Sequence, residues 1–322
     1  MNQILLHPTA RVASPGATLG TYGAELMRAL DRAATADDLA GTLEAWTVVK
    51  DLLAEGEPED RDAVVALVRG HPAAGVAWQD PITRRLFDRP RGHPGDAALL
   101  DLLYGHPAAG PLLRAATPAG RRVTAFSHGL ETAVAVRERR HLLAALIDEA
   151  VDRVGAPDIL AVAGGHLREI EAAPRAREVR RLVALDGDEE GLAEVRRAYG
   201  DLPIECARVP LGRLPARLPV RRRFDLIYAA DLYDRLDDRA AARLTGALFR
   251  ILKPGGRLLF ANFAAGLRDA AYLDALGDWR PVLRDEDAMW AFLDALPEEA
   301  VAATRLFRGG NRAIIYAVAA RR

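Results

Sequence analysis

The chain has 322 residues, of which 50% are hydrophobic and 28% charged, and its 44 basic and 45 acidic residues give a formal net charge of −1. This composition excludes a disordered chain, and the balanced charge gives no electrostatic reason to expect binding to nucleic acid or to a membrane surface. The single cysteine excludes an intrachain disulfide, and the length predicts one large domain with a smaller one.

The N-terminal part of the chain has the pattern of a helical domain. Its first residues lack the basic and apolar stretches of a secretory signal, so we expect a cytoplasmic protein with no membrane span. Over residues 24–69 apolar side chains recur at helical spacing. Prolines interrupt residues 70–120, which predicts short helices joined by turns. We therefore predict a helical cap domain over residues 1–125.

The second part of the chain has the pattern of an α/β domain. A long helix is predicted over residues 132–154, and from Asp158 short apolar runs alternate with helical segments, which is typical of a parallel sheet. The predicted strands are 159–163, 182–185, 204–209, 226–230 and 257–261, with helices at 189–199 and 240–252 and a closing hairpin at 304–307 and 313–319. The predicted fold is a Rossmann-like α/β domain over residues 126–322, with a seven-stranded, mostly parallel sheet.

A glycine pair lies where the first predicted strand ends. The run Ala163-Gly164-Gly165-His166 puts these glycines at a strand-to-helix turn, where a cofactor can approach the backbone closely. Asp186 lies 21 residues after Gly165, at the end of the second predicted strand. A carboxylate at this spacing suits the ribose hydroxyls of an adenine nucleoside. Because either feature alone is also found in ordinary turns, it is their combination that predicts a nucleoside site.

Two later segments bear on whether the predicted nucleoside belongs to NAD or to another cofactor. The run 224–230, a following helix, and the run 252–260 with its Pro254-Gly255-Gly256 turn resemble the fourth strand, helix and fifth strand of class I S-adenosylmethionine (SAM) dependent methyltransferases. The closing hairpin is similar to the strand pair that ends their sheets. This resemblance implies SAM as the cofactor and an enzyme of the transferase class.

A narrower resemblance covers residues 89–322. The chain is similar to extracellular-factor 3-hydroxypalmitic acid methyl ester biosynthesis proteins in the segments 89–96, 165–169, 228–234 and 261–263. It is also similar to azetidine-2-carboxylate synthases, which cyclise SAM and release methylthioadenosine. Both relatives join a helical cap to a SAM-binding domain, so the resemblance implies the same organisation here.

The first motif departs from the methyltransferase pattern. Ala161 stands in place of the usual acidic residue, and Ala163 and Leu167 stand in place of the first and third glycines. Glu169 is a candidate for the missing carboxylate, although an exposed salt-bridging role would suit it equally. Ala230, the last residue of the fourth predicted strand, completes the predicted cofactor contacts.

Four neutral side chains are predicted to lie at the sulfonium end of SAM. Residues that end the fourth and fifth strands face the crevice at the carboxyl edge of the sheet, and aromatic rings attract a cation. The four are Tyr228, Tyr233, Asn262 and Tyr272. The alternative is that the tyrosines pack in the core and that the asparagine belongs to a turn.

Three polar side chains in a Pro/Gly-rich loop are predicted to form a lid over the carboxyl edge of the sheet, with a purely structural turn as the alternative. They are Arg91, His93 and Asp96. The seven histidines show no metal-ligand spacing, so no metal site is predicted.

The sequence therefore predicts SAM-dependent methyl transfer to a small molecule, with a carboxylate or hydroxy-acid derivative as the acceptor class and a role in secondary metabolism. A SAM cyclase that forms azetidine-2-carboxylate is the first alternative, and a non-catalytic SAM-binding module is the second. The acceptor and the oligomeric state are not predicted.

Overall fold

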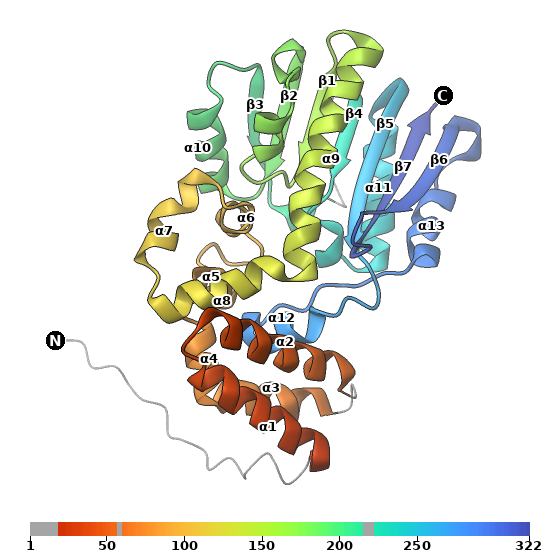
Figure 1. Cartoon of the computed structure of the whole chain (residues 1–322). Helices are drawn as coiled ribbons and strands as arrows, with labels where there is room; N and C mark the ends of the chain where they lie inside the picture. The colour runs from red at the N-terminus through yellow and green to blue at the C-terminus, as the bar shows by residue number, and fades with distance from the viewer. Residues whose placement is uncertain (1–18, 57–59, 215–221) are drawn as a thin grey trace, which may run out of the picture.

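A helical cap and an α/β domain make up the molecule (Figure 1), whose computed structural model describes residues 19–56, 60–214 and 222–322. The α/β domain contains a seven-stranded sheet of order β3-β2-β1-β4-β5-β7-β6, in which β7 runs in the opposite direction to the other six strands. The strands are β1 (Asp158–Val162), β2 (Arg181–Asp186), β3 (Ile204–Arg208), β4 (Phe224–Ala229), β5 (Leu252–Phe263), β6 (Val301–Arg308) and β7 (Ile314–Arg321). The predicted fold class is confirmed.

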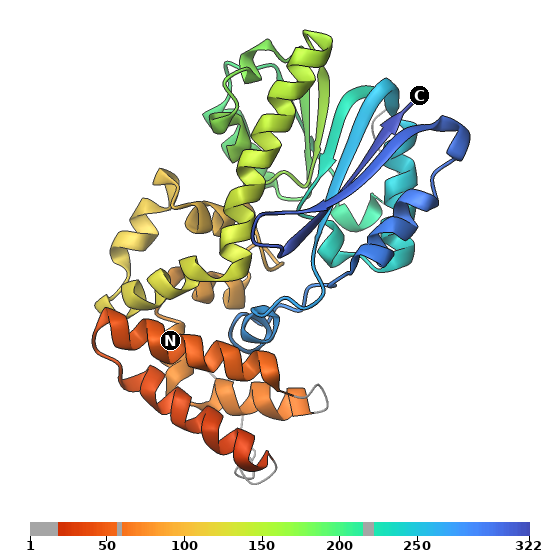
Figure 2. The same cartoon turned by 45° about the vertical axis from the view of Figure 1, so that its right-hand side comes forward.

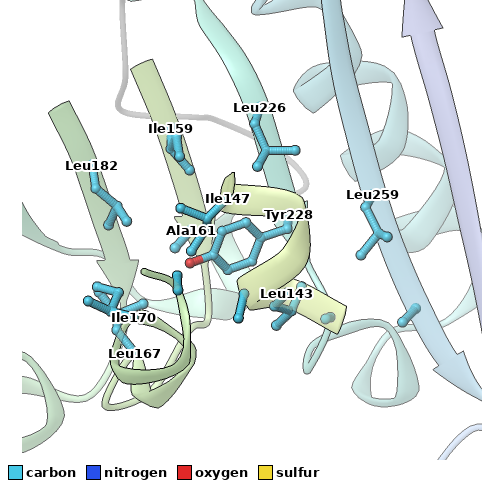
Figure 3. Close-up of a cluster of buried hydrophobic side chains, with 14 of the residues drawn as sticks. Leu143, Ile147, Ile159, Ala161, Leu167, Ile170, Leu182, Leu226, Tyr228 and Leu259 are labelled. Atoms are coloured by element: carbon cyan, nitrogen blue, oxygen red, sulfur yellow. The ribbon is translucent and has the colours of Figure 1, made fainter. Parts of the chain in front are cut away.

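Helices cover both faces of the sheet. Strands β1 and β4 are buried along their whole length, as expected for central parallel strands covered on both sides. One face packs against α9 (Glu131–Val154) and α10 (Glu189–Ala198), and the other packs against α11 (Asp238–Arg250) and α13 (Glu286–Asp294). Figure 3 shows the first of these cores, where Leu143 and Ile147 of α9 lie over the central strands.

The cap consists mainly of the helices that precede α9. These are α1 (Gly20–Thr35), α2 (Leu39–Glu55), α3 (Arg61–Gly70), α4 (Pro72–Ala77), α5 (Pro81–Asp88), α6 (Ala97–Tyr104), α7 (Gly110–Ala115) and α8 (Pro118–Gly129). Helices α4, α5 and α8 each begin at a proline, the residue whose missing N–H costs least in the first helical turn. Helix α9 extends from the cap along the sheet (Figure 2) and so connects the two parts.

A segment from the second half of the chain also belongs to the cap. Helix α12 (Ala270–Gly277) follows β5 in sequence but packs against α2, α3 and α5. Its Tyr272 ring lies 6.1 Å from Trp46 and 5.4 Å from Phe126, measured between ring centroids. The predicted boundary between residues 125 and 126 assigned this segment to the α/β domain, whereas α12 packs in the cap.

Strand β5 is longer than predicted. The Pro254-Gly255-Gly256 run was expected to form a turn before the strand, but it lies within β5, where the pairing with β4 shifts register between Phe224 and Leu226. Helices α12 and α13 were not predicted. In the described part of the chain, no helix is long and apolar enough to cross a membrane.

Candidate cofactor site

The loop after β1 has an unusual backbone. Ala163, Gly165 and Leu167 have φ angles of 53°, 57° and 53°, in the left-handed region that favours glycine. Such a conformation costs a residue with a side chain about 1–2 kcal/mol. Ala163 and Leu167 are the positions where the methyltransferase pattern has glycine, so this glycine loop (residues 163–167) keeps a glycine-like path without those glycines. It leads into a short 3₁₀ helix, η4 (Arg168–Ala172), and not into the predicted α-helix.

Asp186 lies directly beside the glycine loop. Strands β1 and β2 are parallel neighbours, so their carboxyl ends meet at one edge of the sheet. The Asp186 carboxylate accepts hydrogen bonds from the backbone N–H of Gly165 at 3.1 Å and of Asp188 at 3.0 Å. Burial raises the pKa of Asp186. The structure thus brings together the two features from which a nucleoside site was predicted.

A pocket opens beside these two residues. Its sheet side is lined by Ala163, Gly165, Asp186 and Asp188, its cap side by His93, Gly95, Ala97 and Leu100, and its remaining wall by Asp231 and Arg235, which follow β4. It is partly open to solvent. The pocket lies where the strand order reverses, because β1 connects to β2 on one side and pairs with β4 on the other. Ligands of open α/β sheets bind at this switch point.

The predicted lid lies partly over this cofactor pocket. The Arg91 guanidinium contacts the Asp188 carboxylate at 2.6 Å and lies 3.5 Å from Nε2 of His166. His93 accepts a hydrogen bond from Arg235 at 3.0 Å. Asp96 is different, because it caps α6 and pairs with Arg85 at 2.7 Å. Of the three, His93 lines the cap side of the pocket and Arg91 contacts one of its lining residues, Asp188, whereas Asp96 has a structural role in the cap.

A buried network of ion pairs and hydrogen bonds connects the cap to the glycine loop. Asp101 of α6 lies 2.8 Å from Nδ1 of His166 and accepts two hydrogen bonds from Arg168, at 2.8 and 2.9 Å. Arg168 also pairs with Glu194 of α10 at 2.8 Å. Burial alone would raise the pKa of Asp101, but the hydrogen bonds from Arg168 and His166 outweigh it and hold the pKa well below its usual range. Because His166 points toward Asp101, it does not line the cofactor pocket.

Glu169 and Tyr228 pair in the core beneath α9. The Tyr228 hydroxyl donates to Oε1 of Glu169 at 2.6 Å, and burial raises the pKa of both groups. Tyr228 pairs in register with Ala161, and Figure 3 shows its ring among the apolar side chains of this core. Glu169 therefore faces away from the pocket and does not supply the carboxylate that the first motif lacks.

The other three predicted catalytic side chains lie in separate places. Tyr233 is on the opposite face of the sheet, stacked on Phe260 and hydrogen-bonded to Thr245. Asn262 is held by Arg284 at 2.6 Å, and Tyr272 is in the cap core.

The structure therefore does not bring the four together as predicted, because successive strand residues point to opposite faces and because α12 joins the cap. Ala230 lies at the end of β4, where its carbonyl accepts a hydrogen bond from Arg139 at 2.8 Å, and it lines a small cavity with Asn262 instead of the cofactor pocket.

Two residues that the prediction missed lie at the centre of the site. Asp231 pairs with the buried Arg139 at 2.8 Å and with Arg235 at 3.2 Å. Both Asp231 and Arg235 follow β4 at the carboxyl edge of the sheet, and this position was the available signal for them. Asp101, from the cap, had no such signal in the sequence.

A second, apolar cavity adjoins the cofactor pocket. The two share Gly95, Leu100, Asp231 and Arg235 as lining residues. Its apolar lining consists of Ile82, Leu86, Leu99, Leu100, Leu103, Leu130, Ala133, Val136, Phe263, Leu273 and Trp279. Asp231 and Arg235 thus form a polar junction between a polar pocket and an apolar cavity. Among the described residues no cluster of potential metal ligands occurs.

No protein-family model matches the chain, and no curated protein matches its sequence. Solved structures are similar to it. A Bordetella parapertussis protein described as a possible exported protein is 19% identical, with 94% of this chain and 98% of that chain covered and a TM-score of 0.55.

Two methyltransferases with bound S-adenosylhomocysteine (SAH) are similar over part of the chain. The N-methyltransferase NodS from Bradyrhizobium japonicum is 18% identical, with 57% and 87% of the two chains covered and a TM-score of 0.41. The magnesium protoporphyrin IX methyltransferase from Synechocystis is 13% identical, with 59% and 87% covered and a TM-score of 0.44. At these identities the likeness concerns the fold alone, and the Bordetella protein shares that fold, cap included, over nearly its full length.

Proposed function

We propose that the protein is a SAM-dependent methyltransferase that acts on a small molecule. The observation that carries this proposal is the contact between Asp186 and the glycine loop at the switch point of the sheet. A carboxylate at the end of β2, next to a loop where Gly165 has no Cβ, suits the ribose and the adjoining part of an adenine nucleoside. The sequence resemblance to class I methyltransferases supports SAM as that nucleoside.

Asp186 and the glycine loop fit the nucleoside part of SAM. Asp186 would accept hydrogen bonds from the ribose hydroxyls, and the glycine loop would adjoin the nucleoside. Asp231, on the wall toward the apolar cavity, is paired with Arg139 and Arg235, so its charge is already compensated; among the described residues Asp186 is a pocket carboxylate without an ion-pair partner. When bound, SAM supplies an electrophilic methyl group, so the protein itself has to orient the acceptor and exclude water.

The apolar cavity is the proposed acceptor site. Its lining would bury an apolar part of the acceptor, while Arg235 at the junction would hold an anionic group. Nε of Arg235 is buried and has no hydrogen-bond partner among the described residues, so it is an available donor. A carboxylate or hydroxy-acid derivative with an apolar body fits this arrangement. The proposal includes membership of the extracellular-factor 3-hydroxypalmitic acid methyl ester biosynthesis proteins and a role in secondary metabolism.

The cavity also bears on SAM cyclisation, the first alternative. That reaction was expected to use Tyr228, Tyr233, Asn262 and Tyr272 to orient the amine of SAM. None of the four lines the cofactor pocket or the apolar cavity in the described structure. A separate cavity beside the cofactor pocket is instead what a second substrate needs, and this favours methyl transfer.

Mass spectrometry of the reaction products tests the proposal. The protein is incubated with SAM, with and without a panel of carboxylic acids that differ in apolar size. SAH that forms only with an acceptor is the expected result. Methylthioadenosine without an acceptor would indicate cyclisation, and bound but unreacted SAM under all conditions would indicate a non-catalytic module. The Asp186→Ala variant is the control for turnover at this site.

A further inference from the structure

A loop of the cap crosses the carboxyl edge of the sheet at the cofactor pocket. This strap, residues 89–95, connects α5 to α6 (Figure 1). Its Arg91 pairs with Asp188, which follows β2, at 2.6 Å. Its His93 accepts a hydrogen bond from Arg235, which follows β4, at 3.0 Å. Because β1 lies between β2 and β4 in the sheet, the strap passes over the end of β1, where the glycine loop begins.

Polar side chains attach the strap to the α/β domain. In addition to these two contacts, Arg235 donates a hydrogen bond to the carbonyl of Gly95 at 3.1 Å, and Arg91 lies 3.3 Å from the Glu190 carboxylate. None of the residues 89–95 is buried, and their sequence, Arg-Pro-Arg-Gly-His-Pro-Gly, has no aliphatic side chain apart from its two prolines. Segments with few buried apolar groups open locally at a low cost in free energy, so the strap can lift without unfolding the cap.

The helix that follows the strap is attached in a different way. Ala97, the first residue of α6, lies so close to Gly165 that a Cβ built on this glycine would be 3.0 Å from the Cβ of Ala97. Asp101 of the same helix makes buried hydrogen bonds to His166 and Arg168. Close packing and buried ion pairs therefore hold α6 on the glycine loop, and the strap is the neighbouring part of the cap that can move away from the pocket.

We propose that the strap is a gate for cofactor exchange. Its contacts to Asp188 and Arg235 break when the cofactor enters or leaves, and they form again over the bound cofactor. Asp188 and Arg235 line the pocket on either side of β1, so a nucleoside that passes between them has to displace the strap that joins them. This inference rests on the proposed function, because SAM is the cofactor that the pocket is proposed to hold.

Surface plasmon resonance of SAH binding to the immobilised full chain tests this proposal. Arg91→Gln removes the ion pair with Asp188, so the strap should be open more often. The association and dissociation rate constants of SAH should both rise by about 3-fold, the change in population that the loss of a partly exposed ion pair brings. Arg84→Gln is the matched control and should keep the wild-type rate constants, since Arg84 pairs with Asp88 within α5 and neither residue lines the pocket.

A glycine substitution tests the gate without the loss of any side-chain contact. Gly92 of the strap has a φ angle of 82°, and a Cβ built on it would meet no atom within 4 Å. Gly92→Ala therefore strains the closed path of the strap without a clash, and it should also speed SAH exchange. Gly266→Ala is its control, because Gly266 has the same φ angle and the same open space but follows β5, outside the strap.

The rate constants of the four variants decide between the outcomes. Faster exchange in Arg91→Gln and Gly92→Ala, with both controls at the wild-type values, is the expected result. Binding of SAH with the same rate constants in the wild type and in all variants would overturn the gate and leave the proposed function standing. No binding of SAH to any of these proteins would overturn the proposed function, and the gate with it.

Discussion

The Asp186 carboxylate accepts a hydrogen bond from the backbone N–H of Gly165, which links the end of β2 to the glycine loop after β1 at 3.1 Å. This carboxylate is largely buried and carries no ion-pair partner among the described residues. Its free hydrogen-bonding capacity faces the cofactor pocket, and the proposed function depends on it.

The affinity for SAM should depend on pH through Asp186. Burial raises the pKa of this carboxyl, and only the ionised form accepts hydrogen bonds from both ribose hydroxyls. As the pH falls, the group therefore takes up a proton at a higher pH than an ordinary aspartate would, and affinity should fall with it. Calorimetric titrations between about pH 4 and pH 7 measure this dependence. Asp186→Asn should bind more weakly at neutral pH and show a flatter profile, and identical profiles would contradict the assigned role.

Asp101→Asn should destabilise the protein by about 3 kcal/mol. This is the lower end of the range for breaking a buried ion pair, and we expect it because Arg168 keeps Glu194 as a partner. Urea denaturation measures the loss. Asp201→Asn is the control, since Asp201 pairs with Arg177 at an exposed position, and it should leave the urea midpoint almost unchanged.

The same ion network should add to acid denaturation. The folded-state pKa of Asp101 lies below its unfolded value, so its stabilisation is present above about pH 4 and is lost as the pH falls toward the lowered pKa. Between those values the wild type should lose more stability than Asp101→Asn does. Parallel pH dependences for the two proteins would show that the network contributes nothing.

Ala163→Gly should not destabilise the protein and should increase its stability by up to about 1 kcal/mol. Glycine relieves the left-handed strain of about 1–2 kcal/mol at φ 53°. Part of this gain is lost because glycine raises the conformational entropy of the unfolded chain. Ala161→Gly, two residues earlier in β1, is the matched control and should cost about 0.5–1 kcal/mol. Thermal denaturation of both variants checks this pair, and an equal loss in both would contradict the strain argument.

Ala133→Leu should lower methyl transfer to large acceptors while SAM affinity stays within about twofold, because Ala133 lines the apolar cavity and not the cofactor pocket. A larger effect on large acceptors than on small ones is expected in steady-state assays. Ala193→Leu introduces the same side chain at an exposed position of α10 and serves as the control. Loss of SAM binding in the Ala133 variant would show that the two cavities are not separate sites.

Features that depend on neighbouring residues were predictable from the sequence. The apolar runs of β1, β2 and β4 are local patterns, so the sheet was predicted correctly. The spacing from Gly165 to Asp186 is also local, and the structure brings the two residues together, whereas nucleoside binding there stays a prediction. A turn after the first strand was expected from Gly164 and Gly165, but the positive φ angles of Ala163 and Leu167 were not, because alanine and leucine rarely adopt them.

Features that depend on packing over long distances in the chain were not predictable. Tyr233 and Tyr228 lie near each other in sequence, but the pleat of the strand and the following turn put them on opposite faces of the sheet. Tyr272 was expected at the crevice, yet α12 packs its ring into the cap against Trp46. The contact from Asp101 to His166 joins two domains, and no periodicity or spacing indicates it.

The most direct test of the proposed function is calorimetric titration of SAH into the wild type and into Asp186→Ala at neutral pH. The wild type should bind one SAH per chain, and the variant should bind more weakly by about 1–3 kcal/mol, the usual cost of losing hydrogen bonds to a charged group. Circular dichroism spectra that match would show that the variant is folded. Equal affinity in the two folded proteins, or no binding to the wild type, would contradict the assignment of this pocket to SAM.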